Sequence, residues 1–236
     1  MISLTFDLCE TQRETSGYDR RIVSVLKEHN VKATFFASGK WMQSHPRESL
    51  EIMTHPLFEL GAHGWAHENF RHLRRAEAEK ILIRTQLFYD TLFREIQKPQ
   101  SVADHGATPD RPHSALSLFR FPYGTCNTEV LQLLADYGIA AIQWDVVSGD
   151  AVKGRTAKEI TRVVLGQSRP GSIVVFHANG KGHGTAEALP GLISALRRQG
   201  FEFAKVSELL DAGKPVTTPD CYELHPGDDK RYDRFR

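Results

Sequence analysis

Short apolar runs typical of β-strands alternate along this chain with longer segments of helical periodicity. The strand-like runs are 2–7 (ISLTFD), 33–38 (ATFFAS), 58–63 (FELGAH), 118–122 (LFRFP), 139–144 (IAAIQW), 172–177 (SIVVFH) and 201–206 (FEFAKV). Helical patterns fill the intervals at 19–30, a stretch ending near residue 54, 75–97, 127–138, 156–168 and 186–200. This repeated strand-then-helix order indicates a parallel sheet covered by helices.

About seven such strands favour a barrel over an open sheet, and we expect one (β/α)7-type barrel over residues 1–212. The remaining segment, 213–236, is polar and has too few apolar residues for its own core, so we expect it to pack on the barrel. Residues 98–117 contain Pro, Gly, Asp and Ser without periodicity. They predict a long surface loop, a candidate for flanking the site.

The charge balance argues against a polyanionic partner. The 236 residues carry 30 Lys and Arg against 29 Asp and Glu, so the chain has no basic field for nucleic acid or an anionic membrane. No apolar run approaches the roughly 18–20 residues that span a bilayer. The location is left open: the chain is cytoplasmic as written, and exported if an upstream leader has been removed. The oligomeric state is also open.

The three cysteines do not form a recognisable pattern. Cys9, Cys126 and Cys221 have the spacing of neither a disulfide framework nor a zinc cluster. At most one bridge can form, and we expect free thiols.

Polar side chains that suit hydrolysis stand at the ends of several strand-like runs. Asp7 ends the first run, His177 ends the sixth, and Arg120 lies in the fourth. His63 and His67 follow the third run at a spacing that can place two imidazoles on one metal ion. Because the carboxyl ends of barrel strands converge on one face, we expect these residues to form one site.

Together these segments resemble the NodB-homology polysaccharide deacetylases, carbohydrate esterase family 4. The family is marked by TFDD, HxxxH, RxPY, a later Asp and LxH. This chain has TFDL at 5–8, HGWAH at 63–67, RFPYG at 120–124, an Asp at 150 and VFH at 175–177, in the same order. The resemblance implies a distorted barrel, a divalent metal and hydrolysis of an acetyl group from a sugar.

By this resemblance, Asp7 is the general base that takes a proton from the nucleophilic, metal-bound water. Arg120 holds Asp7 through a charge-assisted pair and lowers its pKa. The backbone N–H of Tyr123 is expected to bind the oxyanion opposite the metal.

His177 matches the general acid of the family, because imidazole titrates near neutrality and can protonate a departing amine. Asp150 is expected to accept a hydrogen bond from the other ring nitrogen of His177. Asp145 is the competing candidate for that partner.

The chain departs from the family at Leu8, which stands where the family has a metal-ligating acid. Two histidines leave a divalent ion underbound, so a third ligand is needed. We expect Glu10, because residues two apart in an extended segment share a face. Glu10 as a cap or loop acid, and Cys9 as a thiolate ligand, remain open. His63, His67 and Glu10 suit zinc, with cobalt or manganese as alternatives.

The predicted function is therefore metal-dependent removal of N-acetyl or O-acetyl groups from a saccharide polymer or oligomer. Chitin-like oligomers, peptidoglycan and acetylxylan are not distinguished. Two alternatives are an amidohydrolase of a small non-sugar amide and a metal-free carbohydrate-binding protein that lost its ion with Leu8.

Overall fold

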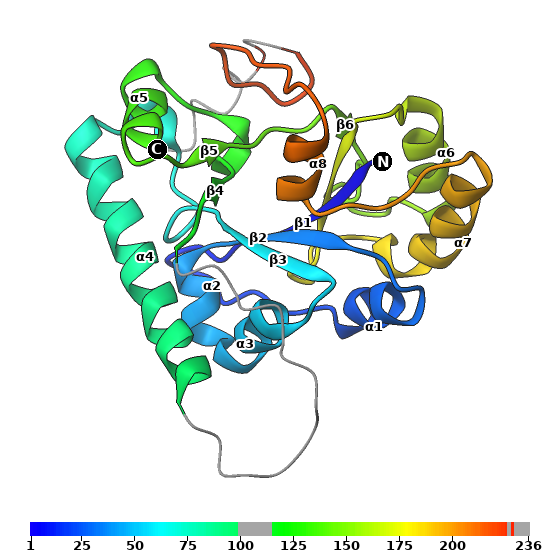
Figure 1. The fold of residues 1–236 in the computed structure, drawn as a ribbon, viewed down its shortest axis with the longest axis horizontal. Helices are drawn as coiled ribbons and strands as arrows, with labels where there is room; N and C mark the ends of the chain where they lie inside the picture. Colours follow the sequence, from blue (N-terminus) through cyan, green and yellow to red (C-terminus); the bar gives the residue numbers. More distant parts are fainter. Residues whose placement is uncertain (99–114, 226–227, 229–236) are drawn as a thin grey trace.

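The computed structural model describes residues 1–98, 115–225 and 228 (Figure 1). Nearly all of the loop predicted at 98–117 therefore lies outside the described residues.

A single parallel sheet of seven strands, in the order β5-β4-β3-β2-β1-β7-β6, forms the centre of the protein. The strands are β1 (Ser3–Leu8), β2 (Ala33–Ala37), β3 (Phe58–Ala62), β4 (Leu118–Phe119), β5 (Ala140–Ala141), β6 (Val146–Val147) and β7 (Ile173–His177). Only residues 142–145 separate β5 from β6, a span of at most about 18 Å. The sheet must therefore curl until its two edges approach each other. The predicted distorted (β/α)7-type barrel is confirmed.

Helices surround this curled sheet, most of them on its outside; the last begins at Val206, which packs with Phe36, Leu118 and Ile142 (Figure 1). They are α1 (Arg20–Glu28), α2 (Gly39–Ser44), α3 (Pro46–Thr54), α4 (Arg75–Gln97), α5 (Thr128–Asp136), α6 (Ala157–Gln167), α7 (Thr185–Arg198) and α8 (Val206–Ala212), with single 3-10 turns η1 (Phe70–His72) and η2 (Pro122–Gly124). Side-chain oxygens of Asp19, Ser38, Asn127 and Thr156 accept N–H groups at the starts of α1, α2, α5 and α6. These caps satisfy backbone donors that a helix start leaves unpaired, so the sequence itself sets where these helices begin.

The prediction of a strand at 201–206 was wrong. Phe203 makes only an isolated bridge to Ile2, because the chain turns at once into α8. The seventh strand is β6 instead, directly after the run at 139–144. Asp145 separates β6 from that run: its carboxylate accepts the backbone N–H of Ile173 at the start of β7.

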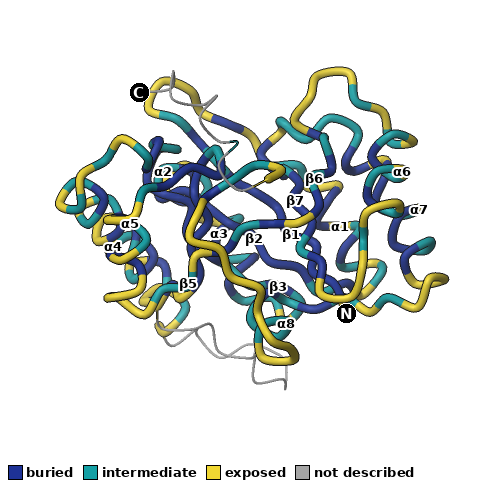
Figure 2. The backbone as a smooth tube through the Cα atoms, turned by 90° about the horizontal axis from the view of Figure 1, so that it is seen from above, coloured by how far each residue is buried: buried dark blue, intermediate teal, exposed yellow. Residues whose placement is uncertain are grey.

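Side chains of β1 alternate between two cores. Leu4, Phe6 and Leu8 face the helices, where the Phe6 ring stacks against Phe35 at 5.3 Å and Phe176 at 5.4 Å. A smaller cluster comprises Phe36, Leu118, Ile142 and Val206. Since Phe36 pairs with Asp7 in the register, this cluster and Asp7 share the inner face of the sheet. Figure 2 shows the central strands β1 and β2 in the colour of buried residues.

Cys126 and Cys221 form a disulfide, so the expectation of free thiols was wrong for this pair. The two residues are 95 positions apart, and spacing alone cannot reveal that folding brings them together. Cys9 remains a free thiol.

The segment around Cys221 packs against the barrel through backbone acceptors. Gln143 Nε2 donates to the carbonyl of Tyr222 at 2.9 Å, and Trp144 Nε1 donates to the carbonyl of Glu223 at 2.7 Å. The boundary between barrel and tail near residue 212 stays a prediction. Within the described ranges, no helix combines the length and apolarity needed to cross a membrane.

Replacing both Cys126 and Cys221 by Ser is expected to lower the free energy of unfolding by about 2–4 kcal/mol, because the bridge closes a long loop in the unfolded chain. Urea denaturation of the oxidised protein measures this change. Reduction of the wild-type protein should reproduce the loss. An unchanged midpoint in both experiments would contradict the pairing.

Candidate active site

Asp7, at the end of β1, forms a buried ion pair with Arg120. Arg120 Nη1 lies 2.9 Å from Asp7 Oδ1 and donates to Thr5 Oγ1 at 2.7 Å, while the guanidinium stacks 4.1 Å from the Phe36 ring centre. Burial alone raises the pKa of Asp7, but neighbouring cationic groups, the Arg120 guanidinium foremost, outweigh it and hold that pKa below its usual 3.8. Asp7 is therefore an ionised carboxylate at neutral pH.

His177, at the end of β7, is held by Asp150. Its Nδ1 lies 2.9 Å from Asp150 Oδ1, and Asp150 Oδ2 accepts the His177 backbone N–H and the Thr185 hydroxyl, each at 2.7 Å. A carboxylate only accepts, so Nδ1 carries the proton. Burial lowers the pKa of His177, but the charge and hydrogen bond of Asp150 outweigh it and raise the pKa above 6.5. Asp145 points to the start of β7 and is not the partner.

Asp7 and His177 lie side by side, because they are register partners in the parallel pair of β1 and β7. Neighbouring strands are about 4.8 Å apart, so the two side chains leave the same edge of the sheet at close range. One is a carboxylate with a lowered pKa, and the other is an imidazole with a raised pKa. A potential base and a potential acid thus occur together.

His63 and His67 lie in the loop that follows β3. His63 Nδ1 is 2.8 Å from the carbonyl oxygen of Arg120, so it donates, and Nε2, 3.9 Å from Asp7 Oδ2, keeps its lone pair. Burial is the main cause that lowers the pKa of both rings, and the pKa of His67 falls well below 6.5. Both imidazoles are therefore neutral, the form that binds a cation.

Two residues of the site have left-handed backbone conformations that favour glycine. The φ angles are 60° at His67 and 59° at Tyr123, and the two rings are in contact, with centres 4.3 Å apart. Such conformations cost on the order of 1–3 kcal/mol and are concentrated at functional sites. Oxyanion binding by the backbone N–H of Tyr123 stays a prediction.

The sequence led us to expect Glu10 beside the two histidines, but the structure places its carboxylate elsewhere. Its carboxylate accepts from the Ser44 hydroxyl at 2.7 Å and from the Ser16 N–H at 3.2 Å, and it lies 3.7 Å from Lys40 Nζ. Glu10 does point to the same side as Leu8. That side faces α2 and the helix-packed core, because Leu8 is fully buried there.

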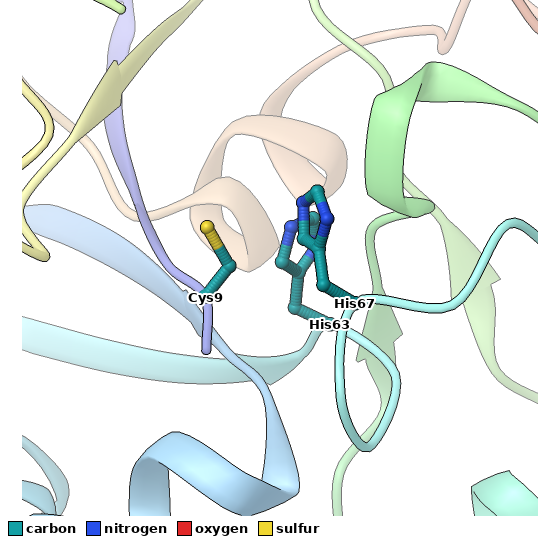
Figure 3. A group of neighbouring side chains, drawn as sticks. All are labelled: Cys9, His63 and His67. Atoms are coloured by element: carbon teal, nitrogen blue, oxygen red, sulfur yellow. The ribbon is translucent and has the colours of Figure 1, made fainter. Parts of the chain in front are cut away.

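Cys9 lies on the face of β1 that Asp7 occupies, because alternation continues one residue beyond the strand. One donor atom from each of Cys9, His63 and His67 lies within 4.8 Å of the others. Figure 3 shows all three side chains projecting in the same direction. Burial and the nearby Asp7 charge raise the pKa of Cys9 to about 12, so without a cation it is a thiol. One sulfur and two neutral imidazoles are a donor set that fits a divalent metal.

Asn179 is a site residue that the sequence analysis missed. Its Nδ2 donates to the carbonyl of Cys9 at 2.8 Å and to Cys9 Sγ at 3.0 Å. The only sequence signal is its place two residues after the strand-ending His177. That signal does not predict a partner across the barrel mouth.

A family model described as Polysaccharide deacetylase matches residues 1–142, more than half of the chain. The chain belongs to the polysaccharide deacetylase family. The matched residues include Asp7, His63, His67 and Arg120. Asp150 and His177 lie beyond the match, so their place in the site rests on the geometry described above.

Relatives extend the similarity over most of the chain. A peptidoglycan-N-acetylglucosamine deacetylase of Bacillus cereus is 28% identical over 90% of this chain and 69% of its own length. The similarly named PgdA protein of Listeria monocytogenes is 31% identical over 88% of this chain. This chain spans only 38% of that longer protein.

Solved structures share the fold. One is a peptidoglycan N-acetylglucosamine deacetylase in complex with an N-hydroxybenzamide compound, with a TM-score of 0.73, 27% identity and coverage of 91% of this chain and 90% of that one. Another, from Bacillus anthracis, is described as a CE4 family pseudoenzyme. It has a TM-score of 0.71, 27% identity and coverage of 89% of this chain and 65% of that one. Because the fold occurs both in active enzymes and in a pseudoenzyme, the fold alone does not establish catalysis. The residues of the site have to provide that argument.

Replacing Arg120 by Met is expected to lower the free energy of unfolding by about 3–5 kcal/mol, because it leaves the Asp7 carboxylate buried without its partner. Urea denaturation at neutral pH tests this. Arg75→Met, which breaks an exposed pair with Asp136, is the control and should leave the urea midpoint almost unchanged. Equal effects of the two substitutions would contradict a special role for the buried pair.

Proposed function

We propose that this chain is a metal-dependent deacetylase that hydrolyses N-acetyl groups of a peptidoglycan- or chitooligosaccharide-type saccharide. The observation that carries the proposal is the register pairing of Asp7 with His177, each held by its own buried partner of opposite charge. The names of the relatives support the substrate class. An amine leaves an amide only after it is protonated, and an imidazole whose pKa is raised suits that demand.

A divalent cation held by His63 and His67 would supply Lewis-acid polarisation and make water acidic enough to react near neutral pH. Arg120 occupies Asp7 Oδ1, so Oδ2, which faces His63, is the oxygen that receives the proton of the attacking water. Arg120 also fixes the rotamer of Asp7 and keeps it ionised. The base is thus ready before substrate binds.

His177 acts as the general acid in this scheme. Asp150 holds Nδ1, which leaves Nε2 to give its proton to the departing nitrogen. Water adds to the acetyl carbon and the amide C–N bond then breaks. The products are acetate and the free amine of the sugar. Asp150 is a positioning residue in this scheme, because it acts through the imidazole.

Leu8 and the pseudoenzyme among the structural neighbours favour one rival, a protein that binds a saccharide without cleaving it. A binder would have no use for a carboxylate with a lowered pKa beside an imidazole with a raised pKa in a buried setting. The presence of both pairs is therefore the argument for turnover.

Purified protein is expected to release acetate from N-acetylated chitooligosaccharides or peptidoglycan, to lose this activity on chelation and to regain it with added zinc or cobalt. Asp7→Asn should reduce turnover by at least about 10²-fold while the bound metal is unchanged, because the amide accepts no proton from water. Saccharide binding without acetate release from any of these substrates or from acetylxylan would establish the rival instead.

Activity is expected to fall as pH rises through the pKa of His177, because the acid must be protonated. Asp150→Asn removes the charge that raises this pKa, so the alkaline limb of kcat/KM should move to lower pH. Asp145→Asn, which changes a carboxylate that does not contact His177, is the matched control and should leave the limb in place. A limb unmoved by Asp150→Asn would remove His177 from the role of acid.

A further inference from the structure

We propose that the thiolate of Cys9 is the third metal ligand, so that this chain holds its cation through one sulfur and two imidazole nitrogens and selects zinc over manganese or magnesium. The inference rests on the proposed function in taking His63 and His67 as the other two ligands. It deepens that function by naming the cation class that the site accepts.

The distances support this donor set. The three donor atoms lie within 4.8 Å of one another. On a tetrahedral zinc ion, with bonds of about 2.3 Å to sulfur and 2.0–2.1 Å to nitrogen, they would be roughly 3.3–3.6 Å apart. Closing the set therefore takes no more than about 1.2–1.5 Å of side-chain movement at the widest separation. Glu10 would instead have to give up its contacts with Ser16 and Ser44 on the other face.

Neighbouring residues already hold Cys9 in place. Asn179 Nδ2 donates to Sγ at 3.0 Å, so the sulfur is an acceptor in this arrangement, as a coordinating thiolate must be. The carbonyl of Cys9 also accepts from Asn179 and from the Ser16 hydroxyl, at 2.8 Å each. Since Glu10 accepts from the Ser16 N–H, it acts as a support for the Cys9 backbone rather than as a ligand. Outer hydrogen bonds of this kind are typical of metal sites.

The nature of the donors sets the metal preference. Thiolate and imidazole favour zinc and cobalt, whereas manganese and magnesium prefer carboxylate and carbonyl oxygens. Asp7 is the nearby carboxylate, but Arg120 occupies one of its oxygens and Asp7 is not part of the three-donor group. The site therefore has a softer donor set than two histidines and an acid would provide.

The test uses the cobalt-loaded protein, because a thiolate bound to cobalt produces a charge-transfer absorption in the near ultraviolet that oxygen and nitrogen ligands do not. The wild-type protein should bind about one cobalt per chain and show this band. Cys9→Ser should lose the band and bind zinc at least about tenfold more weakly. Cys9→Asp should bind metal without the band, with its preference shifted from zinc towards manganese.

Glu10→Gln is the matched control, because it alters the neighbouring residue on the opposite face and should keep both band and stoichiometry. A wild-type spectrum without the band would overturn the proposal, as would loss of metal in Glu10→Gln with full retention in Cys9→Ser. The spectrum is read independently of turnover. A band without acetate release would keep the ligand assignment and overturn the deacetylase, whereas acetate release without a band would do the reverse.

Discussion

The geometry of the site depends first on the buried ion pair between Asp7 and Arg120. Arg120 is completely buried and serves two groups at once: its guanidinium binds Asp7, and its carbonyl oxygen fixes the ring of His63. Because either charge alone would be strongly disfavoured inside the barrel, the pair requires β1 and β4 to keep their relative positions. The positions of the predicted base and of one predicted metal ligand follow from that constraint.

The second pair, Asp150 with His177, has the opposite electrostatic effect. The pKa of Asp7 is lowered and that of His177 is raised, although the two are register partners on neighbouring strands. Each group has its own partner of opposite charge, so one can be ionised as a base while the other is protonated as an acid. Environments that separate the pKa values of adjacent groups in this way are how one site performs both acid and base chemistry near neutral pH.

The chain departs from the family pattern at Leu8, and the alternation of side chains along β1 explains how this residue is accommodated. Alternation along β1 turns Leu8 and Glu10 towards the helices and turns Asp7 and Cys9 towards the histidines. A hydrophobic residue at position 8 therefore adds to the core between sheet and helices. Asn179, on the loop after β7, reaches across to hold Cys9 on the other face. In the proposed metal site, the change at position 8 therefore goes together with a different third ligand, Cys9.

The sequence by itself indicated a parallel sheet of alternating strands and helices, the family and the strand-end residues, because apolar periodicity and motif spacing are local properties. It also placed Arg120 with Asp7 and left Asp150 and Asp145 as rival partners for His177. Only the tertiary structure chose Asp150, paired Cys126 with Cys221, replaced the expected strand at 201–206 by β6 and turned Glu10 away from the histidines. These four outcomes depend on how irregular segments run and which way their side chains point once the barrel has curled. The order of residues along the chain does not contain that information.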